Sequence, residues 1–161
     1  MRLANLTLLL IALLGCATGN TQSESGVDER VVIHATAATA GLYSDRWDVR
    51  LVLDGDSDSA KYEAFFFERG PLKGKAWFWD RDAIAVRSAI EDSDFFSLPG
   101  RLTNDLVELH KADIALTVKV GGSEHTVSIY DPDQLEAQSE KRRFMLVWDA
   151  VFSRLPVQPE W

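Results

Sequence analysis

Residues 114–130, IALTVKVGGSEHTVSIY, contain the pattern that decides the fold. Apolar residues alternate with small or polar ones over 114–120, which is the period of two expected of a strand with one buried face. Gly121-Gly122 then suits a two-residue hairpin turn, and strand-forming residues resume over 126–130. This stretch therefore predicts an antiparallel hairpin.

The residues before this hairpin indicate more strands. Strand-like patterns occur, in order, over 31–36, 47–53, 62–67 and 76–79. A turn that starts at Asp54-Gly55 and a loop around Gly70-Pro71 and Gly74 separate the last three. The simplest arrangement of residues 46–79 is an antiparallel meander.

Two segments change to the helical period. Asp80 is a suitable N-cap for a helix whose apolar face is Ala83, Val86 and Ile90 and which runs to about Asp92. A packed turn closed by Pro99-Gly100 follows, and residues 101–111 are compatible with a loop or short irregular structure. The first helix should therefore lie between the meander and the hairpin.

A second helix is expected at the end of the chain. Asp131 precedes Pro132 at the expected first helical position, and Gln134 stands three residues after this cap. Pro156 should end the helix, whose wide apolar stripe comprises Phe144, Met145, Trp148, Val151, Phe152 and Leu155. The order β-β-β-β-α-β-β-α predicts an α+β domain, with an antiparallel sheet and two helices packed on one face.

Composition and charge restrict the class of protein. The 161 residues are 46% hydrophobic and carry a net charge of −8, which is typical of an acidic globular domain rather than a disordered chain. No basic stripe is present to neutralise phosphates, so we expect no nucleic-acid partner. A single Cys cannot form an intramolecular disulfide or, alone, a zinc site.

The N-terminus has the anatomy of a secretory signal. Arg2 precedes an apolar run over 3–14, followed by Gly15-Cys16. As a helix this run would rise about 18 Å, too short for a hydrocarbon core of about 30 Å. A buried core helix and an ordinary cleavage after Ala17 are weaker alternatives, because the run has no polar face and the lone Cys would be unexplained.

Leu13-Leu14-Gly15-Cys16 resembles the lipobox of bacterial lipoproteins. The resemblance implies cleavage between Gly15 and Cys16 and acylation of Cys16, which would anchor the chain in a membrane. Ala17 after the Cys implies delivery to the outer membrane, with the chain facing the periplasm, if the organism is Gram-negative. Removal of 1–15 would leave 146 residues and shift the net charge from −8 to −9, because only Arg2 is lost.

The mature chain should have two parts. Residues 16–28 would be the lipidated Cys and a flexible tether, since ATGNTQSESGVD holds mostly small and polar residues. Twelve residues of this kind span on the order of 20 Å as a coil. Residues 29–161 would be a single globular α+β domain, long enough to bury an ordinary core.

No motif of catalysis or metal binding is complete. Asp54, Asp56 and Asp58 begin like a calcium loop, but Ser59 and Phe65 stand where Gly and a bidentate Glu are needed. A solvated turn explains the Asp residues, and weak calcium binding is the alternative. The three His residues (34, 110 and 125) lack metal-ligand spacing, and no nucleophile motif is present. We therefore expect no enzyme activity and no cofactor.

Aromatic residues are unusually dense in one expected hairpin. Phe65-Phe66-Phe67 and Trp77-Phe78-Trp79 are consecutive, so each strand directs aromatics to both faces. The linking loop adds Arg69, Lys73 and Lys75, a basic spot on an acidic chain. Either another segment covers the second face, or these residues form a surface for a protein partner, since aromatics and Arg are common interface anchors.

Part of the mature chain resembles emfourin, the inhibitor domain associated with thermolysin-type metallopeptidases. The matching pieces are Phe95–Pro99, Asp113–Val118 and Glu124–Val127, which hold 15 of the 146 residues of the mature chain. The Gly-Gly pair expected near the first strand is missing, and the aromatic hairpin is an addition. The resemblance implies an α+β fold and peptidase inhibition, and no inhibitory residue is transferred.

Three functions remain open from the sequence. The first is a lipid-anchored binding or structural module of the cell envelope, held in the membrane through Cys16 and contacting an envelope protein. The second is an emfourin-like peptidase inhibitor. The third is a small hydrolase whose site is assembled only in the folded chain.

Overall fold

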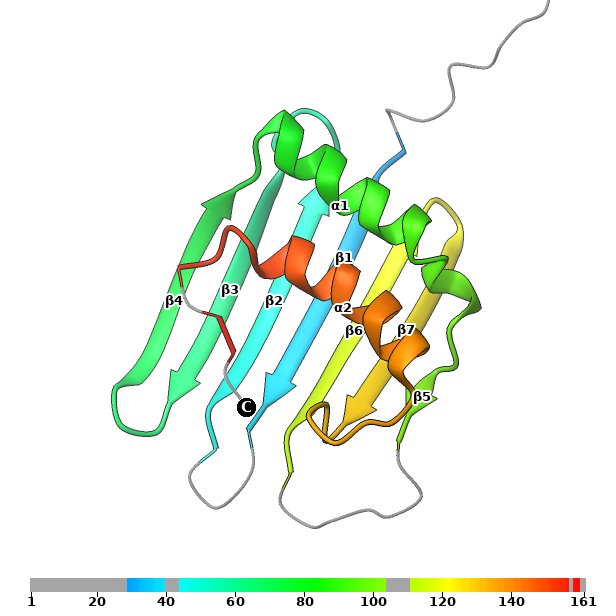
Figure 1. Cartoon of the computed structure of the whole chain (residues 1–161). Coiled ribbons are helices and arrows are strands. Elements are labelled where there is room, and N and C mark those ends of the chain that lie inside the picture. The colour runs from blue at the N-terminus through cyan, green and yellow to red at the C-terminus, as the bar shows by residue number, and fades with distance from the viewer. Residues whose placement is uncertain (1–28, 40–43, 104–110, 157, 160–161) are drawn as a thin grey trace, which may run out of the picture.

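The computed structural model describes residues 29–39, 44–103, 111–156 and 158–159 (Figure 1). These residues form a seven-stranded sheet in the order β4-β3-β2-β1-β6-β7-β5. All neighbours are antiparallel except β5 and β7. The strands are β1 (Val31–Ala38), β2 (Arg46–Leu53), β3 (Ser59–Phe66), β4 (Gly70–Trp77), β5 (Arg101–Leu102), β6 (Asp113–Val120) and β7 (Ser123–Tyr130).

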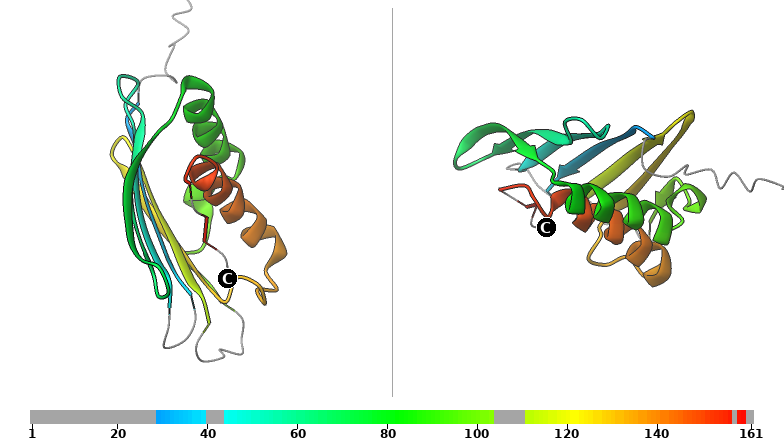
Figure 2. Two further views of the ribbon diagram at one scale, coloured as in Figure 1. Left: turned by 90° about the vertical axis from the view of Figure 1, so that its left-hand side faces the viewer. Right: turned by 90° about the horizontal axis from the view of Figure 1, so that it is seen from above.

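Two helices, α1 (Asp80–Asp92) and α2 (Gln138–Phe152), lie on the same side of the sheet (Figure 2). A short 3₁₀ turn, η1 (Phe95–Ser97), follows α1. The predicted α+β class, the strand–helix order and the placement of both helices on one face are confirmed. No helix in the described part of the chain is long and apolar enough to cross a membrane.

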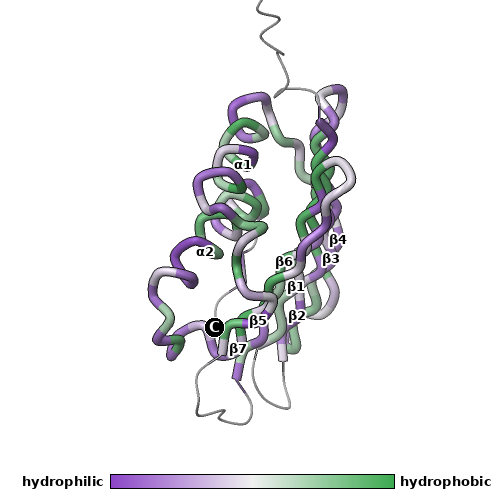
Figure 3. Tube along the Cα trace, turned by 90° about the vertical axis from the view of Figure 1, so that its right-hand side faces the viewer, coloured by the Kyte–Doolittle hydropathy of each residue, from purple (hydrophilic) through white to green (hydrophobic). Residues whose placement is uncertain are grey.

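The core lies between the helices and the sheet. β2 shows why the sequence pattern worked: Trp47, Val49, Leu51 and Leu53 are buried, and the residues between them point away from the helices. On α2 the predicted stripe is buried at Phe144, Trp148, Val151 and Phe152. Figure 3 shows the same division, with hydrophobic and hydrophilic stretches alternating along both layers.

The predicted Gly121-Gly122 hairpin is confirmed, with Gly121 in the left-handed region at φ +56°. The register pairs Val120 with Ser123, so only these two residues form the turn. The segment 101–111, which the sequence left undecided, contributes β5, a two-residue strand parallel to β7.

Both helix starts differ from the prediction. Asp80 is the first helical residue of α1 and Trp79 is the N-cap. The reason is Asp82, which is buried and whose Oδ2 accepts the backbone N–H of Trp79 at 3.2 Å. The carboxylate three residues into the helix thus performs the capping expected of Asp80.

The second helix begins at Gln138, not at Pro132. Asp131 adopts a left-handed backbone (φ +52°), and its carbonyl accepts the N–H of Gln134, so Asp131-Pro132 opens a turn instead. Buried Leu135 holds the segment between this turn and the helix. The helix ends at Phe152, and Leu155 is buried just beyond it.

The expected loop around Gly70-Pro71 and Gly74 is wrong, because these residues belong to β4. β4 is an edge strand, where a Pro need not donate to the ladder and exposed Lys residues discourage pairing with other chains. Gly74 is paired with Tyr62 of β3, whose side chain occupies the space that a Cβ at position 74 would take.

Candidate interaction surface

The face of the sheet opposite the helices, here called the open face, is covered by no described helix (Figure 2). Alternation along each strand directs mostly polar side chains to it. Glu63 Oε1 accepts a hydrogen bond from Lys73 Nζ at 3.0 Å, and His34 Nε2 lies 2.9 Å from Asp48 Oδ2. These cross-strand pairs make most of the open face an ordinary hydrated surface.

One part of the open face is hollowed. A hollow of about 620 Å³, here called the distal hollow, crosses six strands near the C-terminal end of β1. It is shallow and open, because the floor is the sheet itself. Its lining comprises Thr36, Ala37, Ala38, Arg46, Trp47, Asp48, Glu63, Ala64, Phe65, Pro71, Lys73, Asp113, Ala115 and Ser128.

The distal hollow combines apolar and charged groups. The side chain of Phe65 is 48% exposed there, and Pro71 is its ladder partner. On its other side, Phe65 of β3 is paired with Arg46 of β2. Burial raises the pKa of Asp113, and the charge of Arg101 partly opposes this rise. Such a mixture suits a protein surface better than a purely apolar ligand.

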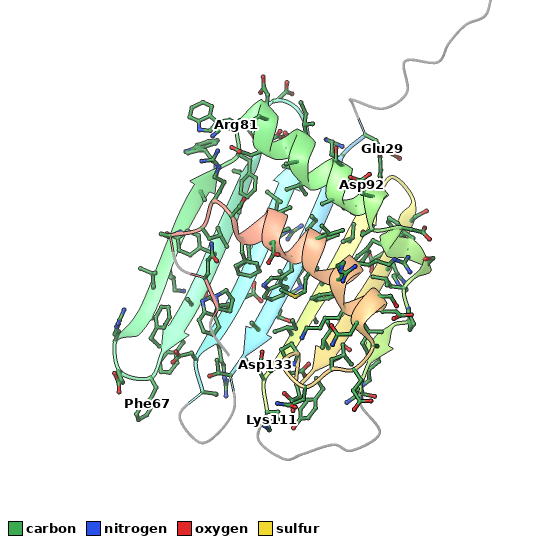
Figure 4. The ribbon with its side chains drawn as sticks, viewed as in Figure 1. Glu29, Phe67, Arg81, Asp92, Lys111 and Asp133 are labelled. Carbon is green, nitrogen blue, oxygen red and sulfur yellow. The ribbon has the colours of Figure 1, made fainter. Side chains whose placement is uncertain are left out.

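The distal hollow lies far from the point where the N-terminal chain enters the domain. Glu29 precedes β1, whereas Ala38, at the other end of this strand, lines the hollow. The eight-residue strand spans about 23 Å. Figure 4 shows the two ends: Glu29 and Arg81 lie at one, Phe67 and Lys111 at the other. The end marked by Glu29 is called the tether end below, after the tether that the sequence predicts for residues 16–28.

Four of the six predicted hairpin aromatics are exposed: Phe65 (48%), Phe67 (51%), Trp77 (55%) and Trp79 (71%). Phe78 is buried, and Phe66 packs edge-on against Trp47 with ring centroids 5.6 Å apart. Strand alternation accounts for the difference between Phe65 and Phe66, because neighbouring residues of β3 point to opposite faces.

The exposed aromatics do not form one continuous surface, as the partner-surface alternative from the sequence would require. Phe65 is paired with Pro71 at one end of the β3–β4 hairpin, and Trp77 with Ser59 at the other. Six residues of strand, about 20 Å, separate Phe65 from the position opposite Trp77. Phe65 and Phe67 therefore lie at the distal end, and Trp77 and Trp79 at the tether end.

The basic residues of the same hairpin divide in the same way. Arg69 is exposed in the turn that follows β3, at the distal end. Lys73 lines the distal hollow and is paired with Glu63. Lys75 places its Nζ 3.7 Å from the centre of the Trp77 ring. The residues of the predicted basic rim therefore lie at two separate places, with Arg69 and Lys73 at the distal end and Lys75 near Trp77.

The acidic turn 54–58 has a structural explanation. Asp58 Oδ1 accepts the N–H groups of Asp54 and Gly55, and Asp54 Oδ1 accepts that of Ser57. This is the local side-chain bonding expected of an Asp-rich turn. No group of three His, Cys, Asp or Glu residues close enough to hold a metal occurs among the described residues.

The other residues singled out from the sequence are placed as follows. Gly15 and Cys16 lie outside the described residues, as does His110. His34 is in β1, and His125 of β7 donates to the carbonyl of Leu98 at 2.8 Å. The emfourin-like pieces are largely packing elements, since Phe95, Leu98, Leu116 and Val127 are all buried.

No known family model matches the sequence, and no curated protein was found to match it. The candidate site therefore depends on the geometry of the chain itself. The distal hollow was missed in the sequence because its lining residues are spread over six strands. The sequence does show which residues of each alternating strand point away from the core. These residues can be assembled into a surface only when the order and register of the strands are known.

Proposed function

We propose that this chain is a lipid-anchored binding module of the bacterial cell envelope, without catalytic activity, that holds a protein partner on its open face. The observation that carries the proposal is the distal hollow, which lies at the opposite end of β1 from the tether. An anchor at Cys16 would then leave the hollow directed away from the membrane, into the periplasm when the anchor is in the outer membrane.

The dimensions agree with this arrangement. The length of β1 alone separates the distal hollow from the tether end by about 23 Å, even when the tether end touches the membrane, and an extended tether would only increase this distance. The hollow is then far enough from the lipid headgroups to receive another folded protein.

The chemistry of the hollow favours a protein partner. Phe65 provides exposed aromatic area in the hollow, whose lining includes the charged Arg46, and Phe67 is exposed two residues further along the chain. Interfaces between proteins characteristically combine aromatic and Arg anchors with a polar rim. Emfourin-like inhibition would be a special case of this function, in which the partner is a metallopeptidase.

The anchor is tested by lipid labelling. We expect the wild-type chain to incorporate a palmitate analogue in a Gram-negative host, and Cys16→Ser to remain unlabelled because no other thiol is available. Labelled protein is detected in the gel after separation of envelope and soluble fractions. An unlabelled wild-type chain would contradict the lipoprotein assignment.

The partner surface is tested by charge substitution. Phe65→Asp with Phe67→Asp should abolish co-purification of the envelope partner, because charges would replace the exposed aromatic area beside the hollow. Leu146→Asp is the matched control, since Leu146 is comparably exposed on α2. Thermal unfolding should be nearly unchanged in both variants. Unfolding of the double variant would show instead that these rings support the core.

A further inference from the structure

Two tryptophans are exposed at the tether end. Trp77 ends β4 and Trp79 caps α1, with side chains 55% and 71% exposed. Arg81 and Ile84, in the first turns of α1, are exposed as well. These four residues are called the tryptophan end. Trp77 and Trp79 stand two residues apart in the chain, and large exposed apolar side chains close to one another mark a contact surface.

The tryptophan end lies on the same edge of the domain as the point where the tether enters. The sheet register aligns Val32, Val52, Ser59 and Trp77 in one cross-strand row. Val32 is only three residues after Glu29, the first described residue. Three strand spacings, about 14 Å, therefore separate the start of β1 from Trp77. Figure 4 places Glu29 and Arg81 at this same end.

Charges of both signs surround these rings. Lys75 lies over the Trp77 ring, and the exposed Arg81, two residues after Trp79, has its Nε 3.5 Å from Oδ1 of Asp82. The acidic turn 54–58 is attached to the same place, because the carbonyl of Asp58 accepts the N–H of Phe78 at 2.9 Å. A zwitterionic phosphatidylethanolamine headgroup offers a phosphate for the cations and an ammonium for the carboxylates. The anionic phosphatidylglycerol headgroup offers only the first.

We infer that the tryptophan end rests in the headgroup region of the bilayer that holds the lipid of Cys16, with phosphatidylethanolamine as the preferred lipid. This inference rests on the proposed lipid anchor. Trp is enriched at membrane–water interfaces, where the ring is partly buried and its N–H stays hydrated. The net negative charge of the domain opposes free binding to anionic membranes, but a short tether supplies a high effective concentration of bilayer.

The contact would orient the domain. With the tryptophan end against the bilayer, the β-strands point away from the membrane, and Phe65, Phe67 and the distal hollow lie at the far end. The two groups of exposed aromatics then have different roles, one toward lipid and one toward protein.

The test uses the lipidated mature protein, which begins at Cys16, in phosphatidylethanolamine–phosphatidylcholine vesicles whose phosphatidylcholine carries brominated acyl chains. Tryptophan emission should be quenched in wild type. Trp77→Ser with Trp79→Ser should float with the vesicles through its lipid but lose most of the quenching. Phe65→Ser with Phe67→Ser, the matched control at the distal end, should be quenched like wild type.

The outcomes separate the two proposals. Wild type that floats without quenching overturns the membrane contact and leaves the anchor standing, and so does a double Trp variant that keeps the quenching. Shielding of these tryptophans only after a protein partner is added also overturns the contact. Wild type that does not float refutes the anchor, and this inference with it.

A second arm tests the preferred headgroup. Replacing phosphatidylethanolamine by phosphatidylglycerol at low salt should reduce the quenching of wild type, because the acidic turn 54–58 is then repelled. Adding salt should restore part of the quenching. Stronger quenching in phosphatidylglycerol would overturn the preference for the zwitterionic headgroup.

Discussion

Arg154 joins the two helices through a single buried carboxylate. Its guanidinium lies 2.6 Å from Oδ1 of Asp82, which is only 9% exposed and also accepts the N–H of Trp79. The hydrogen bond from Arg154 is the main cause that lowers the pKa of Asp82 below its ordinary value of 3.8. The start of α1 and the chain after α2 are therefore held together by one ion pair.

We expect Arg154→Met to lower the free energy of unfolding by about 1–3 kcal/mol at pH 7, because Asp82 loses its shortest charged contact and keeps only Arg81, whose Nε lies 3.5 Å away. The stabilisation from a lowered pKa is complete above pH 3.8 and is lost as the pH falls through the pKa of the folded state. The variant should therefore lose less stability than wild type on acidification below pH 4. Denaturant unfolding at several pH values measures this, with Arg142→Met, at an exposed position of α2, as the control.

Long-range polar contacts of this kind could not be predicted from the sequence. Arg143 is a second example, since its Nε donates to the carbonyl of Ser93 at 2.6 Å and its Nη2 to that of Asp94 at 2.7 Å. It thereby satisfies carbonyls at the end of α1 from a position 50 residues away. The sequence around a charged helix residue does not show whether its side chain bonds a distant carbonyl or is simply hydrated.

At the scale of elements, the sequence patterns succeeded where one face is buried and the other hydrated. β2 and β6 alternate cleanly and were found with nearly correct ends. The full extent of β4 was not predicted, because Pro71, Gly74 and two exposed Lys residues suggest a loop. Only its position at the sheet edge, which depends on the order of all strands, makes such a strand acceptable.

Gly74 is required in β4 by the side chain of Tyr62. A Cβ at position 74 would lie 2.2 Å from the Tyr62 hydroxyl oxygen and 2.4 Å from the ring carbon that bears it. Gly74→Ala should therefore displace the ring and lower stability by about 1–3 kcal/mol. Gly122→Ala, where nothing lies within 4 Å, is the control.

A double-mutant cycle measured by thermal unfolding separates the clash from other effects. Tyr62→Ala removes the obstacle, so adding Gly74→Ala to it should cost much less than Gly74→Ala alone. Additive effects of the two substitutions would contradict this account of the glycine.

At the scale of the whole molecule, the class and order of elements followed from the sequence, but the candidate surface did not. The aromatic hairpin appeared as one surface because Phe65–Phe67 and Trp77–Trp79 are close in sequence. The register places their exposed rings at opposite ends of the domain. Strand pairing therefore changes one expected surface into two, and it alone creates the distal hollow.

We expect the distal hollow to hold a protein partner in the cell envelope. Photo-crosslinking tests it most directly, with a benzophenone side chain at Ala115 inside the hollow and at Leu146 on α2 as the matched control. In cells of the organism that makes this protein, we expect Ala115 to give a discrete adduct with an envelope protein and Leu146 to give none. The absence of an adduct from Ala115, or the same adducts from both positions, would contradict the account.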